Sequence, residues 1–275
     1  MYKNIENNLS EFANKKFGQN FLKDSTILNK IIEAMPKDGM PIVEIGPGLG
    51  DLTGQLLKVG RVRAYEVDKR LCEYLKSKFK ESINSGQFEL ICKDILEKSG
   101  SLYDKSYSLI ANLPYYIATK IVLNALHDGN CKRIMVMVQK EVAQKFSAKV
   151  GDKDFGSLAI LSQSVAEVKT LFDVPPSSFV PPPKVTSAIL YIEKNGSLDD
   201  FEFEKFLKIA TKQPRKTLFK NLSTNFDKNM LNKIFEKLNI KKTIRAHELE
   251  LSKYHHLYKE LKKDIVDESR KWTTK

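Results

Sequence analysis

Between residues 41 and 192 the sequence alternates short apolar runs with stretches of helical periodicity. The apolar runs, which predict strands, lie at 41–45, 61–67, 88–92, 108–111, 133–138 and 185–192. Helical patterns follow four of them, at 51–59, 69–80, 119–126 and 140–149. Strands that alternate with helices at this spacing predict an α/β fold, with a mostly parallel sheet covered by helices on both faces.

This alternation stops after a turn-like linker, Asn195-Gly196-Ser197. The rest of the chain shows helical periodicity alone, at 201–212, 228–238 and 251–263. We therefore expect two domains: an α/β domain over residues 1–197 and a smaller, all-helical domain over residues 198–275.

Most of the positive charge lies in the predicted helical domain. The chain has a formal net charge of +12 and a pI near 9.3. Residues 201–275 hold 19 Lys and Arg against 10 Asp and Glu, a net of +9, which leaves a net of +3 for residues 1–200. Such an excess favours a polyanionic partner such as nucleic acid. The alternative is a solvated basic face with no partner.

Three cysteines, Cys72, Cys92 and Cys131, are far apart in sequence and form no CxxC pair. Their spacing argues against a disulfide framework and against a zinc site, and it fits the reducing cytosol. Residues 1–16 contain no apolar segment of the kind found in secretory signals. No apolar run approaches the ~18 residues that a membrane span requires. We therefore expect a cytoplasmic protein with no metal site and no membrane contact.

A glycine cluster follows the first predicted strand, at Gly46, Gly48 and Gly50. Such a turn lets the backbone approach a ligand at the carboxyl end of the strand, although GxGxG is weaker than the full GxGxxG fingerprint and also occurs in turns without a ligand. Glu66 ends the second predicted strand, where a carboxylate can hold a ribose diol. Asp94, just past the third, can accept a hydrogen bond from an adenine amino group. Together they indicate an adenosine cofactor, either NAD or S-adenosylmethionine.

The choice between these cofactors depends on Asn112, Leu113, Pro114 and Tyr115, which follow the fourth predicted strand. The lone pair of an exocyclic adenine amine is delocalised into the ring, so acceptors aimed at its N–H groups make it more reactive. The amide oxygen of Asn112 and the backbone carbonyl of Leu113 can be those acceptors. Pro114 fixes the turn, and Tyr115 or Tyr116 offers a face for the base, a contact worth about 1–3 kcal/mol in single-strand sites. Positioning an amine against a sulfonium needs no titratable base. The motif thus favours S-adenosylmethionine, the alternative being an ordinary proline turn.

The Asn-Leu-Pro-Tyr motif resembles that of N6-adenine methyltransferases, and the whole chain resembles the ribosomal RNA adenine dimethyltransferase family, in particular its small-subunit (KsgA) group. The matching segments occur in the family's order, at 16–22, 43–50, 112–115, 139–142, 155–158 and 174–187. The resemblance implies a Rossmann-like class I methyltransferase domain, with a mostly parallel seven-stranded sheet, followed by a small helical RNA-binding domain.

The resemblance also implies roles for single residues. The implied cofactor-binding set is Gln19, Asn20, Leu22, Gly46, Gly48, Glu66, Asp94 and Asn112. Gln19, Asn20 and Leu22 would close over the cofactor, a role that the residues alone do not indicate. Gly46 would lie beneath the methionine end, and Asn112 would lie between the cofactor and the target amine.

Phe179 lies in a segment with five prolines between residues 175 and 183. Proline fixes one backbone dihedral angle, so this segment can present a ring at low entropic cost. We hypothesise that Phe179 and Tyr115 sandwich an adenine flipped out of its stack. The alternative is that Phe179 packs in the core.

Two basic motifs of the helical domain resemble family motifs with one change each. Residues 213–218 read Gln-Pro-Arg-Lys-Thr-Leu, with Pro214 where the family has arginine, and residues 245–249 read Arg-Ala-His-Glu-Leu, with His247 where it has glutamate. Contacts to phosphates and to RNA shape suit the remaining charge. We expect RNA contacts from Arg215, Lys216 and Arg245.

The family implies dimethylation of the N6 amines of two adjacent adenosines in the 3′-terminal hairpin loop of small-subunit (16S) rRNA. It implies an assembling small ribosomal subunit as partner, and we expect a monomer. One alternative is a large-subunit methyltransferase of the macrolide-resistance type. Leu113 and the Phe-Val-Pro-Pro-Pro-Lys-Val segment favour the small-subunit group instead. Another alternative is a non-catalytic RNA-binding assembly factor. The presence of Glu66 and Asn112 argues against it, because a protein without catalysis would not need them. The remaining alternative is an NAD-dependent dehydrogenase.

Overall fold

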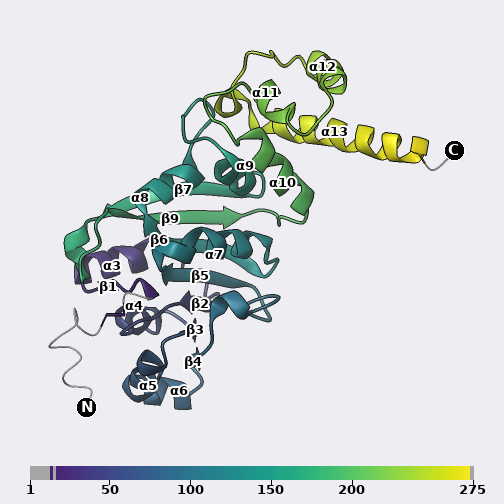
Figure 1. Cartoon of the computed structure of the whole chain (residues 1–275). Coiled ribbons are helices and arrows are strands. Elements are labelled where there is room, and N and C mark those ends of the chain that lie inside the picture. Colours follow the sequence, from purple (N-terminus) through teal and green to yellow (C-terminus); the bar gives the residue numbers. More distant parts are fainter. Residues whose placement is uncertain (1–12, 15–16, 273–275) are drawn as a thin grey trace. The chain divides into compact units, whose positions relative to one another are not determined.

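The computed structural model describes residues 13–14 and 17–272, and within them the chain forms two compact units (Figure 1). The prediction about a secretory signal falls on residues 1–16, nearly all of which lie outside the described ones. One unit extends to Ala143 and resumes over Ala166–Ser197; the other comprises Gln144–Val165 and the chain from Leu198. The expected single domain over residues 1–197 is therefore interrupted. Residues 144–165 belong to the helical unit because α9 (Ser157–Gln163) packs against α10 (Phe201–Ala210).

The first unit is built on a seven-stranded sheet, so the predicted fold class is confirmed. Its strands are β2 (Ile42–Ile45), β3 (Val62–Tyr65), β4 (Phe88–Ile91), β5 (Tyr107–Asn112), β6 (Cys131–Gln139), β7 (Ala166–Val174) and β9 (Ser187–Lys194). Their order is β4-β3-β2-β5-β6-β9-β7. The first five strands in this order pair in parallel, and β9 runs antiparallel to both of its neighbours.

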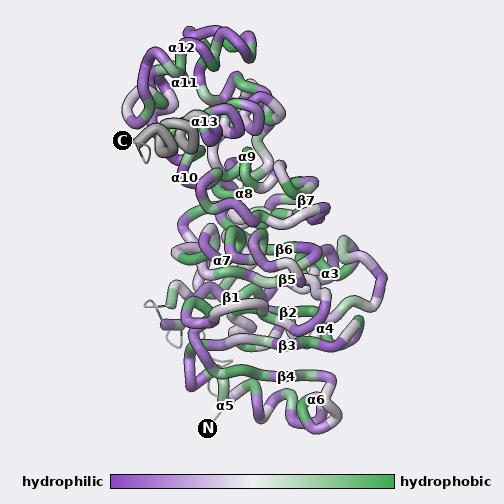
Figure 2. The backbone as a smooth tube through the Cα atoms, turned by 90° about the vertical axis from the view of Figure 1, so that its right-hand side faces the viewer, coloured by the Kyte–Doolittle hydropathy of each residue, from purple (hydrophilic) through white to green (hydrophobic). Residues whose placement is uncertain are grey.

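Helices connect the parallel strands and enclose the sheet. They are α4 (Asp51–Leu56), α5 (Lys69–Lys78), α6 (Lys80–Asn84) and α7 (Tyr115–His127), preceded by α3 (Ser25–Ala34). The central strands β5 and β6 are largely hydrophobic along their length (Figure 2). Strands buried on both faces read as continuous apolar runs, which is why these two were recognisable in the sequence.

The first unit also contains a two-stranded antiparallel sheet, which joins two segments that are far apart in sequence. It pairs β1 (Phe21–Leu22) with β8 (Phe179–Val180), with Leu22 opposite Phe179. Lys23 N donates to Ser178 O at 2.9 Å, and Ser178 Oγ donates to Asp24 at 2.9 Å. These bonds fix the N-terminal segment to the proline-rich segment.

The second unit is helical throughout the part described. Besides α9 and α10 it contains α11 (Leu218–Leu222), α12 (Lys228–Lys237), the 3-10 turn η4 (Ala246–Glu248) and α13 (Leu251–Trp272), and α8 (Lys140–Ser147) leads into it. Phe206 packs edge-on against Tyr254, whose hydroxyl donates to Ala246 O at 2.6 Å. Among the helices in the described part of the chain, none is long and apolar enough to cross a bilayer.

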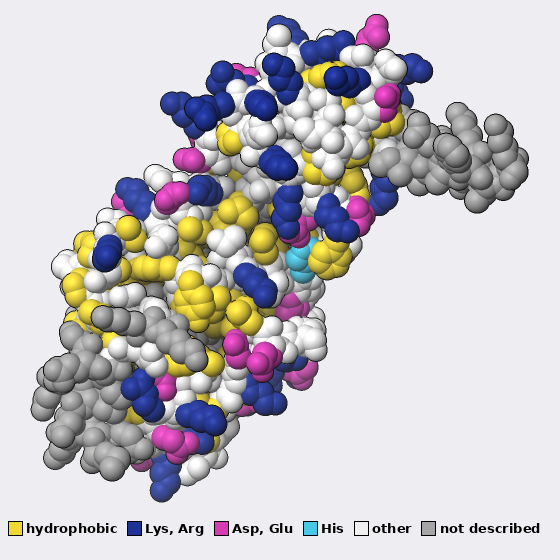
Figure 3. Space-filling view, viewed as in Figure 1, with side chains coloured by type: hydrophobic (Ala, Val, Ile, Leu, Met, Phe, Trp, Pro, Cys, Tyr) yellow, Lys and Arg dark blue, Asp and Glu magenta, His cyan; other side chains and the backbone are white. Residues whose placement is uncertain are grey.

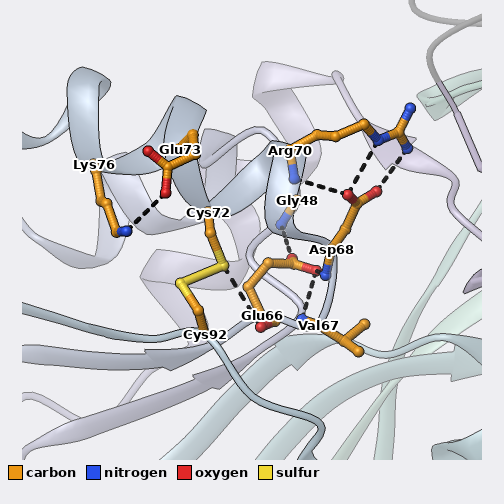
Figure 4. The surroundings of a disulfide bond; sticks show 9 residues. All are labelled: Gly48, Glu66, Val67, Asp68, Arg70, Cys72, Glu73, Lys76 and Cys92. Atoms are coloured by element: carbon orange, nitrogen blue, oxygen red, sulfur yellow. Dashed lines mark hydrogen bonds and ion pairs between the residues drawn. A yellow bond between two sulfur atoms is a disulfide. The ribbon is translucent and has the colours of Figure 1, made fainter.

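The expectation that the cysteines form no disulfide is wrong. Cys72, in α5, and Cys92, directly after β4, are bonded to each other (Figure 4). Their separation of 20 residues hides the contact in the sequence, but β3 and β4 are parallel neighbours, so the helix after β3 meets the end of β4. Cys131 is buried and is not in a disulfide.

Candidate active site

A pocket opens at the carboxyl ends of β2, β3, β4 and β5, where polar residues follow each strand. After β2 the chain adds β3 and β4 on one side, and β5 then lies on the other side of β2. Such a reversal of strand order leaves a crevice at the carboxyl ends, the usual place for ligands in open α/β sheets. Every residue of the predicted cofactor-binding set lines this pocket, as do four of the five predicted catalytic residues: Gln19, Asn20, Leu22, Gly46, Gly48, Glu66, Asp94, Asn112, Leu113, Pro114 and Tyr115.

The glycine turn after β2 lines the pocket. Gly46 and Gly48 have φ angles of 67° and 60°, in the left-handed region that favours glycine. A Cβ atom at Gly48 would lie 3.2 Å from the ring of Phe21. The absence of side chains therefore exposes backbone that a ligand can approach, which is the role predicted from the sequence.

Glu66 lies directly after β3, next to the glycine turn. Its Oε1 accepts hydrogen bonds from Val67 N and Asp68 N, both at 2.9 Å, and its Oε2 accepts one from Gly48 N at 3.3 Å (Figure 4). These three donors hold the carboxylate in one orientation. Burial nevertheless raises the pKa of Glu66 to about 7, since the charged form is removed from water.

Glu44 is a second buried carboxylate of the pocket, and it was not singled out from the sequence. It lies on β2 with 1% of its surface exposed, and Thr53 Oγ1 donates to its Oε2 at 2.7 Å. Burial raises the pKa of Glu44 to about 8, and the negative charge of Glu66 adds to the rise. An acidic residue within the apolar run Ile-Val-Glu-Ile was the signal, because a glutamate is almost never fully buried unless it has a partner.

The N-terminal segment closes one side of the pocket through two hydrogen bonds. Gln19 Nε2 donates to Asp68 Oδ2 at 3.1 Å, and Asn20 O accepts from Asn112 Nδ2 at 3.1 Å. Asp68 also caps α5 and binds Arg70. Burial acts to raise the pKa of Asp68, but the hydrogen bonds from Arg70 and Gln19 outweigh it and lower that pKa below its usual value.

Asn112 ends β5 and lines the pocket. Because its amide nitrogen donates to Asn20 O, the amide oxygen Oδ1 is the atom that can accept a bond from a ligand. Leu113 N donates to Met137 O at 3.2 Å, which fixes the next peptide group to β6. Tyr115 is anchored by a 2.6 Å hydrogen bond between its hydroxyl and Ser187 Oγ, and burial raises its pKa. Tyr116, in contrast, is 63% exposed at the pocket.

Phe179, the fifth predicted catalytic residue, lies outside the lining of the pocket. It is 2% exposed and belongs to a core cluster with Leu22, Ile27 and Val174. In β8 it lies opposite Leu22, which belongs to the same core cluster and also lines the pocket. This packing is that of a core phenylalanine in a proline-rich segment, and the stacking of Phe179 on an adenine stays a prediction.

The two basic motifs of the helical unit are neighbours. Thr217 and Arg245 form an antiparallel bridge, and Leu218 N donates to Ile244 O at 2.8 Å. Arg215, Lys216 and Arg245 are all exposed. Basic side chains are spread over this unit, with few acidic ones among them on the face shown in Figure 3. The pairing places the two segments that carry the three predicted RNA contacts side by side.

Comparison with known proteins gives consistent matches. The sequence profile of the family described as Ribosomal RNA adenine dimethylase matches residues 11–263. The chain is 55% identical over 248 residues to Ribosomal RNA small subunit methyltransferase A of Sulfurimonas denitrificans, covering 90% of this chain and 93% of that one. It is 49% identical over 272 residues to the protein of the same name from Campylobacter curvus, covering 94% and 95%.

Solved structures share the fold. A dimethyladenosine transferase from Plasmodium falciparum has a TM-score of 0.74 at 29% identity, covering 88% of this chain and 98% of that one. The 23S rRNA methyltransferase ErmE has a TM-score of 0.67 at 22% identity, covering 88% and 100%, a likeness of fold.

Proposed function

The chain belongs to the ribosomal RNA adenine dimethylase family, and we propose that it dimethylates the N6 amines of two adjacent adenosines in the 3′-terminal hairpin loop of small-subunit (16S) rRNA. The resemblance seen in the sequence is thereby confirmed at the level of the family: the protein is an S-adenosylmethionine-dependent rRNA adenine dimethyltransferase. One hydrogen bond carries the proposed chemistry: Asn112 Nδ2 donates to Asn20 O. This bond orients the Asn112 side chain and leaves its Oδ1 to accept a hydrogen bond from the target amine.

The pocket suits S-adenosylmethionine, a cofactor that supplies a methyl group activated by a positively charged sulfonium. Glu66 and Asp94 give the pocket two carboxyl groups, and negative charge there favours a cationic ligand. Glu66 would accept hydrogen bonds from the ribose hydroxyls. Asp94 Oδ1 accepts from Leu96 N at 2.8 Å, which leaves Oδ2 to accept from the adenine amino group. Gly46 and Gly48 would lie against the cofactor with their backbone.

Asn112, the last residue of β5, and the residues that follow it would position the target amine. Asn112 Oδ1 and the carbonyl oxygen of Leu113 would accept its two N–H groups, directing the nitrogen lone pair at the methyl group. The ring of Tyr115, whose hydroxyl is hydrogen-bonded to Ser187, would stack on the face of the base. Tyr116, the next residue, is exposed. Catalysis of this kind is positioning and preorganised electrostatics, and it needs no general base at the moment of attack.

The relatives favour small-subunit rRNA as the substrate. Those at 46–55% identity bear the name Ribosomal RNA small subunit methyltransferase A, whereas the large-subunit enzyme ErmE is 22% identical. The paired basic motifs with Arg215, Lys216 and Arg245 fit contacts to RNA phosphates. We propose that the enzyme acts as a monomer in the cytoplasm, on a small ribosomal subunit under assembly.

The test is transfer of radiolabelled methyl groups from S-adenosylmethionine to unmethylated small subunits, followed by nuclease digestion to identify the labelled nucleoside. Dimethyladenosine from 16S rRNA is the expected product. Asn112→Ala should abolish transfer, while Asn84→Ala, an exposed asparagine of α6 in the same unit, should not change it. Label in large-subunit rRNA would support the macrolide-resistance type of enzyme. RNA binding without label on any RNA would support the assembly factor.

A further inference from the structure

The Cys72–Cys92 bridge joins the two segments that carry the acidic residues assigned to the adenosine part of the cofactor. Cys72 lies in α5, six positions after Glu66, and Cys92 lies two positions before Asp94. Glu66 N donates to Ile91 O at 3.0 Å, so the ends of β3 and β4 are aligned. Figure 4 shows the bridge directly beside Glu66, and Cys72 Sγ also contacts Glu66 O at 3.7 Å.

We propose that Cys72 and Cys92 form a redox-modification site that controls the affinity of the pocket for S-adenosylmethionine. In the disulfide form, the segment from Cys92 to Asp94 is tied to α5, and Lys93 and Asp94 line the pocket beside Glu66. In the dithiol form this tie is absent, and cofactor binding has to order the segment. This inference rests on the proposed function, since it assigns the pocket to that cofactor.

The geometry allows both states without a change of fold. The Cα atoms of the two cysteines are 6.1 Å apart, within the range for disulfides, and parallel pairing of β3 with β4 keeps them close when the bond is absent. Cys92 is exposed, whereas Cys72 is 2% exposed. An exchange partner therefore reaches Cys92 first, and Cys72 serves as the resolving thiol.

The chemistry is thiol–disulfide exchange with a low-molecular-weight disulfide such as oxidised glutathione. The Cys92 thiolate attacks one sulfur of that disulfide, forms a mixed disulfide and releases one thiolate, which takes up a proton. Cys72 loses its proton and attacks the Cys92 sulfur, which completes the protein disulfide and releases the second thiol. Two electrons and two protons pass from the protein to the small disulfide, and a dithiol reductant reverses the reaction.

A reversible bond suits the compartment in which small ribosomal subunits assemble. Disulfides there are usually transient and redox-sensing, because thiols are kept reduced. An exposed disulfide is also easier to reduce than a buried one. The site therefore senses a rise in cellular disulfide and passes it on to the cofactor pocket.

The test measures the dissociation constant of S-adenosylmethionine by calorimetry for the full-length protein, once oxidised with glutathione disulfide and once reduced with dithiothreitol. Ordering a short segment on binding costs enough that the reduced form should bind about threefold to tenfold more weakly. Cys92→Ser should bind like the reduced form under both conditions. Cys131→Ala, which changes the cysteine outside the bridge, should keep the difference between the two conditions.

The outcomes separate this inference from the proposed function. Equal dissociation constants in both redox states, or a redox effect retained in Cys92→Ser, overturn the inference and leave the methyltransferase intact. Absence of S-adenosylmethionine binding in both states overturns both. The comparison of oxidised with reduced wild-type protein needs no variant, so it stands even where a substitution impairs folding.

Discussion

Cofactor affinity should depend on pH through Glu66. The carboxylate would accept hydrogen bonds from the ribose, so the bound form requires it to be ionised. Burial raises its pKa to about 7 in the free protein, so below that pH binding has to release a proton. About one molecule in eleven is ionised at pH 6 and about ten in eleven at pH 8. The dissociation constant should therefore fall about tenfold over this range, equivalent to ~1.4 kcal/mol.

Isothermal titration calorimetry at pH 6, 7 and 8 measures this effect. Repeating the pH 6 titration in buffers with different ionisation enthalpies should show release of nearly one proton per cofactor bound. Glu66→Gln should bind more weakly and lose the pH dependence, since an amide does not titrate in this range. Glu73→Gln, which changes an exposed residue of α5, should retain it.

A flat dissociation constant between pH 6 and 8 would refute the reasoning. So would a pH dependence that persists in Glu66→Gln, because another group would then release the proton. Proton release without any change in affinity is excluded by linkage, so the two measurements check each other.

Three further predictions concern stability and RNA binding. Burial raises the pKa of Glu44 to about 8, so the stability contributed by its protonated form is complete below the unfolded pKa and is lost progressively as pH rises from there through 8; Glu44→Gln should unfold at a temperature similar to that of wild type at about pH 4 and at a higher one at about pH 9. Phe179→Ala should lower the free energy of unfolding in urea by about 3–5 kcal/mol, because it leaves a cavity in the core; a loss below about 1 kcal/mol would contradict this placement. Arg215→Ala or Arg245→Ala should each reduce the salt-dependence slope of RNA binding by about one, whereas an unchanged slope would remove that residue from the phosphate contacts.

The parts of the fold that the sequence predicted are those where burial leaves a clear pattern. The strands β5 and β6 are buried on both faces and read as apolar runs. The edge strand β7 was missed because most of its residues are at least partly exposed, so its sequence lacks such a run. The short helix α9 was missed for want of length, and with it the membership of residues 144–165 in the helical unit.

The residues of the candidate site likewise fall into those that the sequence alone predicted and those that it did not. Glu66 and Asn112 follow strands that the sequence revealed, so their place at one edge of the sheet followed from parallel topology. Gln19 and Asn20 carry no local pattern, and their position depends on hydrogen bonds to Asp68 and Asn112, which are remote in sequence. Those contacts are tertiary, and only the family resemblance indicated them.

The disulfide shows why sequence spacing was a poor guide at this edge of the sheet. Parallel register aligns Tyr65 with Ile91, so whatever follows β3 meets whatever follows β4 irrespective of the number of residues in the crossover. The same alignment that places Glu66 near Asp94 for an adenosine ligand therefore also places a cysteine of α5 against Cys92. A cross-link between these two strand ends cannot form without restraining the pocket. Redox state and cofactor affinity are consequently linked by the topology itself, and each should shift the other: bound S-adenosylmethionine should make the disulfide harder to reduce by the same factor by which the disulfide tightens binding.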